Sequence, residues 1–507
     1  MRTLAGPVGL AVILGIVFVA YARILDDWFT SDDFWYLRAA QTATYPDYIQ
    51  NAFDFTRDGP VPEFLYRPLY VAIFPVFYFL FGLEAWAYHL LGLAVHMANT
   101  GLVWLIARRL SGRLAVAHSA AFLFGLHPTY APAVAWITNN VAVFAMCSSL
   151  SSLLLFLTYL EGGRRRQALY GASFVAMVVA MLLHPEAVVL PLILVLSFFL
   201  LYAKGLEKGP SLRTWWFLVP HLYVGMGIFV VQLWAGQYSD FEVTSFSFGS
   251  HLFENFFQYL ALAGNPFGTD LAHLEHWRTL IPLVGVVLVS VYLLAVERRR
   301  RPVVVLLLVW FYLTVVVLAS PSTFDARPRK LYAAGPPLAM ILALAGVSLW
   351  DWLAARGISP STRRDRPRPL RRRGSWLPTP RSPYSRAPAL LLALAVAALV
   401  ALPWRTSQVV EPENLAKWTH SGGVSSERYK AIVKKVRETH PVVPQGGRLE
   451  LVGRSVPIVF GVLNPKLVDA IQVYYDDDVA VIGAKTPEDI RRYPPLPASR
   501  RLTVFFE

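Results

Sequence analysis

Residues 26–36 read Asp-Asp-Trp-Phe-Thr-Ser-Asp-Asp-Phe-Trp-Tyr, and residues 66–69 read Tyr-Arg-Pro-Leu. Both stretches lie in the first loop, residues 26–84, which follows the first apolar segment of the chain. Carboxylates and an arginine among aromatic residues beside a membrane are costly unless they face water, a partner or a substrate. We therefore take this loop as the candidate active site.

The composition indicates an α-helical, multi-pass membrane protein. Of 507 residues, 55% are hydrophobic and 16% are charged, and long apolar runs alternate with short arginine clusters. The net charge of +14 comes largely from arginines in the connections, where membrane topology explains them, so we expect no nucleic-acid partner. The single cysteine, Cys147, excludes an intramolecular disulfide and a cysteine-rich metal site.

Eleven segments have about the length and hydrophobicity of a membrane span, for which roughly 20 apolar residues are needed. The first is expected to be a retained anchor, because no small-residue cleavage site follows it. A further apolar run, Pro68–Leu83, would put Arg108–Arg113 on the side of the acidic loop if it spanned, which the positive-inside rule disfavours. We assign this run to the outer interface. The eleven segments lie near residues 6–24, 85–107, 114–127, 141–160, 167–184, 187–203, 215–234, 279–296, 302–320, 331–350 and 388–404.

The resulting topology separates two kinds of connection. The arginine clusters share the cytoplasmic face with the amino terminus, at residues 108–113, 164–166, 204–213, 298–301 and 356–386. The polar and aromatic connections share the extracytoplasmic face, at residues 26–84, 127–140, 184–186, 235–278 and 320–330. We predict a location in the cell (inner) membrane, with one basic face and one face that collects candidate catalytic groups.

The predicted domain organisation has four parts. Residues 1–350 form the transmembrane catalytic module, residues 351–387 a cytoplasmic linker rich in arginine and proline, residues 388–404 the last span, and residues 405–507 a small extracytoplasmic α/β domain. In that domain we expect a helix over 425–439 and strands over 448–452, 457–462, 479–482 and 502–506.

Several motifs in the first 350 residues resemble those of the GT-C superfamily of membrane glycosyltransferases. The similarity is greatest to the transmembrane and tetratricopeptide-repeat O-mannosyltransferases and their bacterial relatives. Two features depart from that pattern: no repeat of about 34 residues follows, and His184-Pro185-Glu186 stands where such relatives often carry a lysine-glutamate pair. The motifs that carry the resemblance are Asp32-Asp33, Tyr66-Arg67-Pro68-Leu69 leading into Leu80-Phe81-Gly82-Leu83, Tyr88-His89-Leu90 with His96 and Asn99, His127-Pro128, Ala133-Val134-Ala135-Trp136-Ile137, Tyr259-Leu260 with Pro266 and Asp270, and Arg329-Lys330-Leu331-Tyr332.

The resemblance implies an inverting transfer of a monosaccharide from a polyprenyl-phosphate carrier on the extracytoplasmic face. Such a transfer needs a base for the acceptor's proton and cations for the departing phosphate. We assign the base to Asp32, with Asp33 as the alternative, because the resemblance places the diacidic pair there. Arginine suits the phosphate because its planar fork meets phosphate oxygens with two hydrogen bonds. The candidates for binding the substrate are Arg67 beside Tyr66, Arg327, Arg329 and Lys330 for the phosphate, and His127 and Glu186 for the sugar.

Structural roles stay open for each of these residues. An acidic pair often caps a helix, and a basic residue at the interface often contacts lipid head groups. Trp136 and Tyr332 are expected to be interface anchors first and platforms for a sugar second. We assign the stripe of His89, His96 and Asn99 to packing between helices rather than to function. No cofactor is assigned, although a divalent cation at the adjacent carboxylates is conceivable, and the metal requirement is unknown.

The function predicted from the sequence is therefore glycosyl transfer from a polyprenyl-phosphate sugar to a protein, lipid or glycan acceptor at a membrane. An alternative from another class is a transporter or flippase of a lipid-linked sugar intermediate, which would need a polar path continuing to the cytoplasmic side. A third is a non-catalytic scaffold, which would leave Asp32, Asp33 and Arg67 without a common purpose.

Overall fold

A computed structural model describes residues 5–54, 66–161, 166–202, 212–236, 249–265, 277–320, 328–357, 386–411, 424–459, 462–475 and 479–506. In this part of the chain, eight helices are long and apolar enough to cross a membrane, and three shorter apolar helices accompany them. The chain is thus a multi-pass membrane protein. Arg327, Asp270 and most of the predicted linker 351–387 lie outside the described residues.

Each of the eleven predicted segments coincides with an observed helix, although the number that span the membrane stays a prediction. The helices α6 and α13 are among those whose apolar part is shorter than a typical span. The bundle consists of α1 (Ala5–Tyr21), α5 (Ala85–Ser111), α6 (Leu114–Gly125), α8 (Asn140–Leu160), α9 (Arg166–Leu183), α10 (Leu190–Ser197) continuing into η5 (Phe198–Tyr202), α11 (Leu212–Gly236), α13 (Trp277–Val296), α14 (Arg301–Ala319), α15 (Gly335–Gly357) and α16 (Arg386–Val409).

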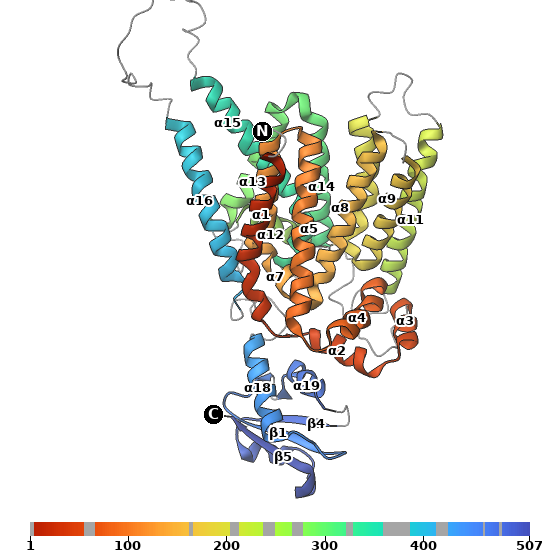
Figure 1. Ribbon diagram of the computed structural model, residues 1–507, viewed down its shortest axis with the longest axis vertical. Coiled ribbons are helices and arrows are strands. Elements are labelled where there is room, and N and C mark those ends of the chain that lie inside the picture. The colour runs from red at the N-terminus through yellow and green to blue at the C-terminus, as the bar shows by residue number, and fades with distance from the viewer. Residues whose placement is uncertain are drawn as a thin grey trace, which may run out of the picture.

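The amino terminus and the C-terminal domain lie at opposite ends of this bundle (Figure 1). Arginines gather at the amino-terminal end, where Arg109 pairs with Glu161 and Arg113 pairs with Asp351 at 2.6 Å. The helix α5 ends there because Gly112 adopts a left-handed conformation with φ 70°, which glycine accepts without steric cost. The arrangement places positive charge at one end, and the orientation in the membrane stays a prediction.

The first loop forms short helices at the end of the bundle that faces the C-terminal domain (Figure 1). The predicted interfacial run forms α4 (Pro68–Phe81), whose 14 residues are too few to span a bilayer. Proline at its first position fits, because that residue's N–H has no partner within a helix. The other helices of this loop are η1 (Ala22–Asp26), α2 (Asp33–Thr42) and α3 (Tyr45–Phe53).

Short helices also fill several connections of the bundle. The predicted loop 235–278 contains one unexpected helix, α12 (Ser250–Gly264), which packs against α13 and α14. The remaining short elements are η2 (Pro128–Tyr130), α7 (Ala131–Ala135), η3 (Ile137–Asn139), η4 (Pro185–Val189), η8 (Arg298–Arg300) and η9 (Pro328–Ala334).

The C-terminal domain is α/β, as predicted, with a parallel sheet of order β4-β1-β5. In its register, Leu451 lies opposite Gly483 on one side and Val504 on the other. The prediction of one strand over 457–462 was wrong, because this segment contributes to two short antiparallel strands, and the helix α19 was missed. The elements are α18 (Ser426–Thr439), β1 (Arg448–Gly453), β2 (Ile458–Val459), β3 (Val462–Leu463), α19 (Pro465–Gln472), β4 (Ala480–Ala484), η12 (Pro487–Arg492), η13 (Ala498–Arg500) and β5 (Arg501–Phe506).

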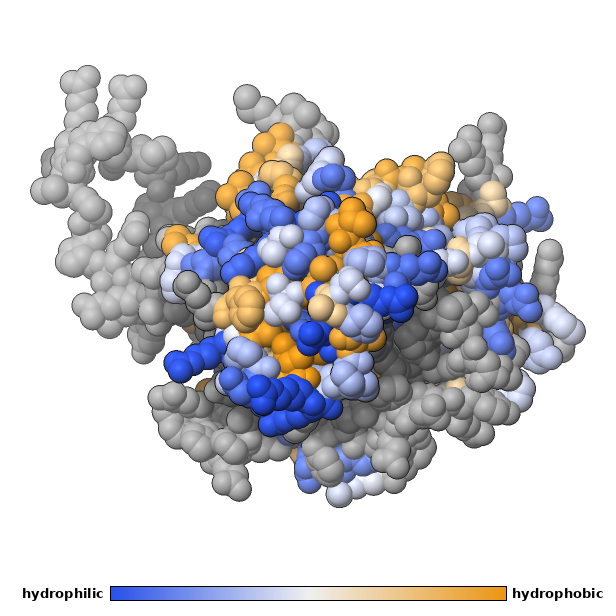
Figure 2. Space-filling model, turned by 90° about the horizontal axis from the view of Figure 1, so that it is seen from below, coloured by the Kyte–Doolittle hydropathy of each residue, from blue (hydrophilic) through white to orange (hydrophobic). Residues whose placement is uncertain are grey.

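Buried hydrophobic residues form two clusters. The larger fills the helix bundle. The second runs from the first loop into the C-terminal domain and joins, for example, Phe34 and Val71 to Tyr429 and Leu467. Seen from the C-terminal end, the surface of the described residues mixes hydrophilic side chains with hydrophobic patches (Figure 2). The domain is therefore packed onto the first loop through a shared apolar core.

Candidate active site

The two adjacent carboxylates of the first loop face different surroundings. Asp33 is buried, with 1% of its surface exposed. Its Oδ2 accepts a hydrogen bond of 2.8 Å from the backbone N–H of Thr30, and its Oδ1 accepts one of 2.8 Å from the N–H of Thr138 and another from the Thr138 hydroxyl. Burial raises the pKa of Asp33 to about 7. Asp33 thus ties the first loop to η3.

Backbone conformation separates the two carboxylates. Ser31, just before them, has φ 54° and is the one non-glycine residue with positive φ in the described part of the chain. This left-handed conformation is costly for a residue with a Cβ, and such strain often marks functional sites. Ser31 lies at the turn after which the side chain of Asp33 points into the loop, whereas that of Asp32 contacts the C-terminal domain.

Asp32 is partly exposed and pairs with a lysine of the C-terminal domain. The Nζ of Lys466 lies 2.5 Å from Oδ1 of Asp32, and the side chains are 12% and 18% exposed. Within the described part of the chain, the second oxygen of Asp32, Oδ2, has no hydrogen-bond partner. One carboxylate oxygen of Asp32 is therefore held by the lysine.

Three of the predicted basic residues gather around one predicted acid. The positive charges of Lys330, Arg329 and Arg67 all act on Glu186 and on the neighbouring His184. These residues come from η9, from the start of α4 and from η4. The structure thus brings together residues that are up to 263 positions apart, from Arg67 to Lys330. Such a group suits an anionic ligand.

A small cavity of about 30 Å³ lies beside this group. His184 and Glu186 line it together with apolar side chains, which include Met146 and Trp310. Sites for small ligands are typically about ten or more times larger, so this cavity alone does not hold a substrate. It shows that the charged group borders a small, mostly apolar space.

The segment 136–138 connects the charged group to the acidic pair. The guanidinium of Arg329 lies 4.7 Å from the ring centre of Trp136, and two residues later Thr138 binds Asp33. On the other side, Nη2 of Arg67 donates a hydrogen bond of 3.1 Å to the hydroxyl of Tyr36 on α2. Both halves of the candidate site are thus held by the same short elements at one end of the bundle.

Two other predicted residues have different surroundings. His127 is buried and stacks on Tyr130 with 4.5 Å between ring centres. Tyr66 is almost buried beside Arg67, and burial raises its pKa. The structure does not connect His127 to a sugar site, whereas Tyr66 stays a candidate.

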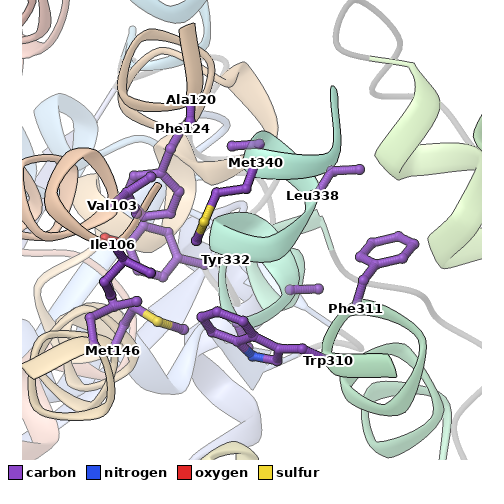
Figure 3. Packing of buried hydrophobic residues seen from close by; sticks show 14 of the residues in the cluster. Val103, Ile106, Ala120, Phe124, Met146, Trp310, Phe311, Tyr332, Leu338 and Met340 are labelled. Atoms are coloured by element: carbon purple, nitrogen blue, oxygen red, sulfur yellow. The ribbon is translucent and has the colours of Figure 1, made fainter. Parts of the chain in front are cut away.

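Tyr332 is a core residue and Trp136 is buried as well, so their predicted placement at the membrane interface was wrong. Tyr332 is fully buried, and Figure 3 shows it beside Phe124, in the same buried cluster as Met146 and Trp310. Its hydroxyl lies 2.9 Å from Nδ1 of His96 and accepts a hydrogen bond of 3.0 Å from Asn99. These bonds join α5 to η9, which confirms the assignment of His96 and Asn99 to packing between helices.

We expect Tyr332→Phe to destabilise the bundle without weakening substrate binding. The change removes a hydroxyl that two buried groups share, at a cost of about 1 kcal/mol for each lost hydrogen bond. The melting temperature in detergent should fall, while KM for a substrate stays within about twofold of wild type. A raised KM with an unchanged melting temperature would return Tyr332 to the candidate site.

Comparisons with known proteins support this fold. No protein-family model matches the sequence. The chain is 34% identical over 94 residues to the protein O-mannosyl-transferase TMTC2 of Mus musculus, which is 18% of this chain and 11% of that protein, and equally to TMTC2 of Homo sapiens. The chain thus matches only about a tenth of the length of these curated relatives.

Solved structures resemble the chain over nearly its whole length. The crystal structure of the Archaeoglobus fulgidus oligosaccharyltransferase, tethered with an acceptor peptide containing the NVT sequon, superposes with a TM-score of 0.51 at 14% identity over 96% of this chain. This chain has the GT-C fold. The archaeal oligosaccharyltransferase AglB in complex with an inhibitory peptide and a dolichol-phosphate gives a TM-score of 0.50 at 14% identity over 96% of this chain. The chain covers 64% and 65% of these two proteins.

The sequence leaves the metal requirement unknown, and the surroundings of Asp32 bear on it. Among the described residues, no group of three His, Cys, Asp or Glu side chains has the arrangement of a metal site. Lys466 also occupies the position beside Asp32 where a cation would sit. The described residues therefore do not fit a divalent ion at Asp32, and we derive no step through one.

The structure adds two residues to the candidate site that the sequence analysis did not single out. Thr138 and Lys466 contact the two carboxylates. The pattern Asn464-Pro465 before a short apolar stretch is typical of a helix start, and it would have placed Lys466 in the first turn of α19. No signal in the sequence showed which element that turn would face.

Proposed function

We propose that the protein is a glycosyltransferase that moves a monosaccharide from a polyprenyl-phosphate carrier to an acceptor hydroxyl. The observation that carries the proposal is the convergence of the charges of Arg67, Arg329 and Lys330 on Glu186, which lines the small cavity. Arg67 belongs to the same loop as Asp32. The comparisons support the reaction class, because the superposed structure is an oligosaccharyltransferase and the curated relative is an O-mannosyl-transferase by name. In one of these relatives a dolichol-phosphate is bound, which is chemistry of the same kind as the proposed carrier.

The chemistry is a single displacement. The acceptor oxygen forms a bond to the anomeric carbon as the bond from that carbon to the carrier phosphate breaks, so the anomeric configuration inverts. The acceptor proton passes to Oδ2 of Asp32, and the bonding pair leaves with the phosphate. Arg67, Arg329 and Lys330 stabilise the charge that develops on the phosphate oxygens. Such electrostatic stabilisation of the transition state is usually the largest single contribution to catalysis. The atoms and charges balance without a further reactant.

The acceptor and the sugar are also parts of this proposal. Lys466 of the C-terminal domain borders Asp32, and we propose that the acceptor approaches Asp32 beside this domain. We propose a protein acceptor, since O-mannosyl transfer to protein is what the names of the curated relatives describe.

The direct test supplies the purified full chain, in lipid nanodiscs, with a panel of radiolabelled polyprenyl-phosphate monosaccharides and native membrane acceptors. We expect label to move from at least one donor to the acceptor fraction. If no donor gives transfer, and the protein instead moves donor across the bilayer of proteoliposomes, the transferase proposal is wrong and a transporter takes its place.

Arg329→Met should weaken donor binding. A hydrogen bond to a charged group contributes about 1.5–3 kcal/mol, so KM for the donor should rise roughly tenfold or more. The matched control is Arg299→Met, at an exposed arginine of η8 that lies outside the candidate site. An equal rise in both variants would mean that general attraction to anionic lipid, rather than a phosphate site, sets KM.

A further inference from the structure

We infer that Lys466 is a positioning residue for Asp32, so that one active site is built from the first loop and the C-terminal domain together. This inference rests on the proposed function. Asp32 and Lys466 are 434 positions apart, and the ion pair between Oδ1 and Nζ measures 2.5 Å. A lysine that is only 12% exposed requires an anionic partner to offset its loss of hydration.

Local structure fixes Lys466 before it reaches its partner. The side chain of Asn464 caps α19 and accepts a hydrogen bond of 2.9 Å from the backbone N–H of Lys466. The ammonium then lies over the ring of Trp35, 2.8 Å from its centre. Burial lowers the pKa of Lys466, and the charge of Asp32 opposes that shift. The lysine is thus held between an aromatic face and the proposed base.

Other contacts keep the C-terminal domain at this position on α2. Nη1 of Arg38 lies 2.6 Å from Oδ1 of Asp469, one turn after Lys466 on α19. Nε2 of Gln41 donates a hydrogen bond of 3.1 Å to the carbonyl of Val473. Trp28 stacks on Tyr474. These contacts are made by side chains other than Lys466, so substitutions at Lys466 and at Asp469 can be compared to separate orientation of the base from docking of the domain.

The ion pair explains how Lys466 fixes the orientation of the Asp32 carboxylate. Because Oδ1 is fixed by the lysine, the carboxylate cannot rotate freely, and Oδ2 keeps one direction toward an incoming hydroxyl. A misplacement of about 1 Å can reduce a rate by roughly 100-fold. Lys466 touches Asp32 rather than substrate, so it acts through the orientation of the base.

The test compares transfer by full-length wild type, Lys466→Met and Lys466→Arg in nanodiscs. We expect Lys466→Met to lower kcat about tenfold or more with KM for the donor unchanged, and Lys466→Arg to restore most of the rate. Arg437→Met is the matched control, because this cation of α18 stacks on Tyr474 and has no contact with Asp32. Wild-type turnover in the same assay tests the proposed function separately.

Two results would overturn the inference. The first is an equal loss of kcat in Asp469→Asn, which weakens docking but leaves Lys466 in place, because Lys466 would then serve docking alone. The second is a rate for Lys466→Met at or above wild type, which would show that the lysine is dispensable or blocks the base. Should wild type show no turnover, amide hydrogen exchange still decides: faster exchange over residues 31–36 in Lys466→Met but not in Lys466→Arg supports the inference, and unchanged exchange contradicts it.

Discussion

Asp32→Asn is expected to lower the rate of sugar transfer roughly 100- to 10,000-fold, which is the usual contribution of a general base. Asparagine has nearly the same shape, but its amide cannot take the acceptor proton. Donor binding should persist, because the phosphate-binding side chains Arg67, Arg329 and Lys330 are unchanged. The measurements are single-turnover transfer of radiolabelled sugar and equilibrium binding of the carrier to the same preparation.

The control for Asp32→Asn is Asp26→Asn, at an exposed carboxylate of the same loop. Its rate should equal that of wild type. Full activity of Asp32→Asn would exclude Asp32 as the base, whereas equal losses in both variants would indicate a general effect of charge on this loop.

Asp33→Ala is expected to destabilise the protein by about 3 kcal/mol, because it leaves the buried N–H groups of Thr30 and Thr138 without an acceptor. Asp33→Asn keeps one acceptor oxygen and should cost about 1 kcal/mol. Thr138→Val removes only the hydroxyl donor and serves as the control from the other side of the contact. Thermal unfolding of the detergent-solubilised proteins gives the order of the variants. A melting temperature of Asp33→Ala equal to wild type would show that the contact to η3 does not hold the loop.

The stability that Asp33 provides should also depend on pH. Burial raises its pKa from the usual value of 3.8 to about 7, so in this window the folded state binds the proton more tightly than the unfolded state. Stability then falls as the pH rises from about 4 to about 7. The difference in melting temperature between wild type and Asp33→Asn should therefore shrink between about pH 5 and about pH 8. A constant difference would mean that Asp33 does not titrate in this range.

The sequence was sufficient to predict the features of the fold that depend on local hydrophobicity. Apolar runs predicted the membrane helices. The topology that follows from the positive-inside rule assigned Arg67, Arg329 and Lys330 to the same face of the membrane. The order of the motifs predicted the GT-C fold, which the comparisons confirm. These signals are strong because a bilayer requires long apolar segments and penalises unpaired charge.

The sequence was insufficient where tertiary contacts determine the surroundings of a side chain. Two adjacent aspartates look alike in a sequence, and only the turn at Ser31 and the donors of Thr138 distinguish them. Tyr332 looked like an interface anchor because aromatic residues are common there, yet two polar partners on α5 hold it in the core. The contact between Lys466 and Asp32 depends on how two distant segments pack, which no local pattern reports.

The second hydrophobic cluster affects the order in which the protein can fold during synthesis. Its residues come from positions 29–88 near the start of the chain and from positions 424–504 near its end, with a few from between. While the ribosome adds the intervening helices, the apolar face of the first loop has no C-terminal domain to pack against. Contacts of such long sequence separation form slowly. The buried core beside the loop that carries Asp32 is therefore complete only after the last strand, β5, has been synthesised.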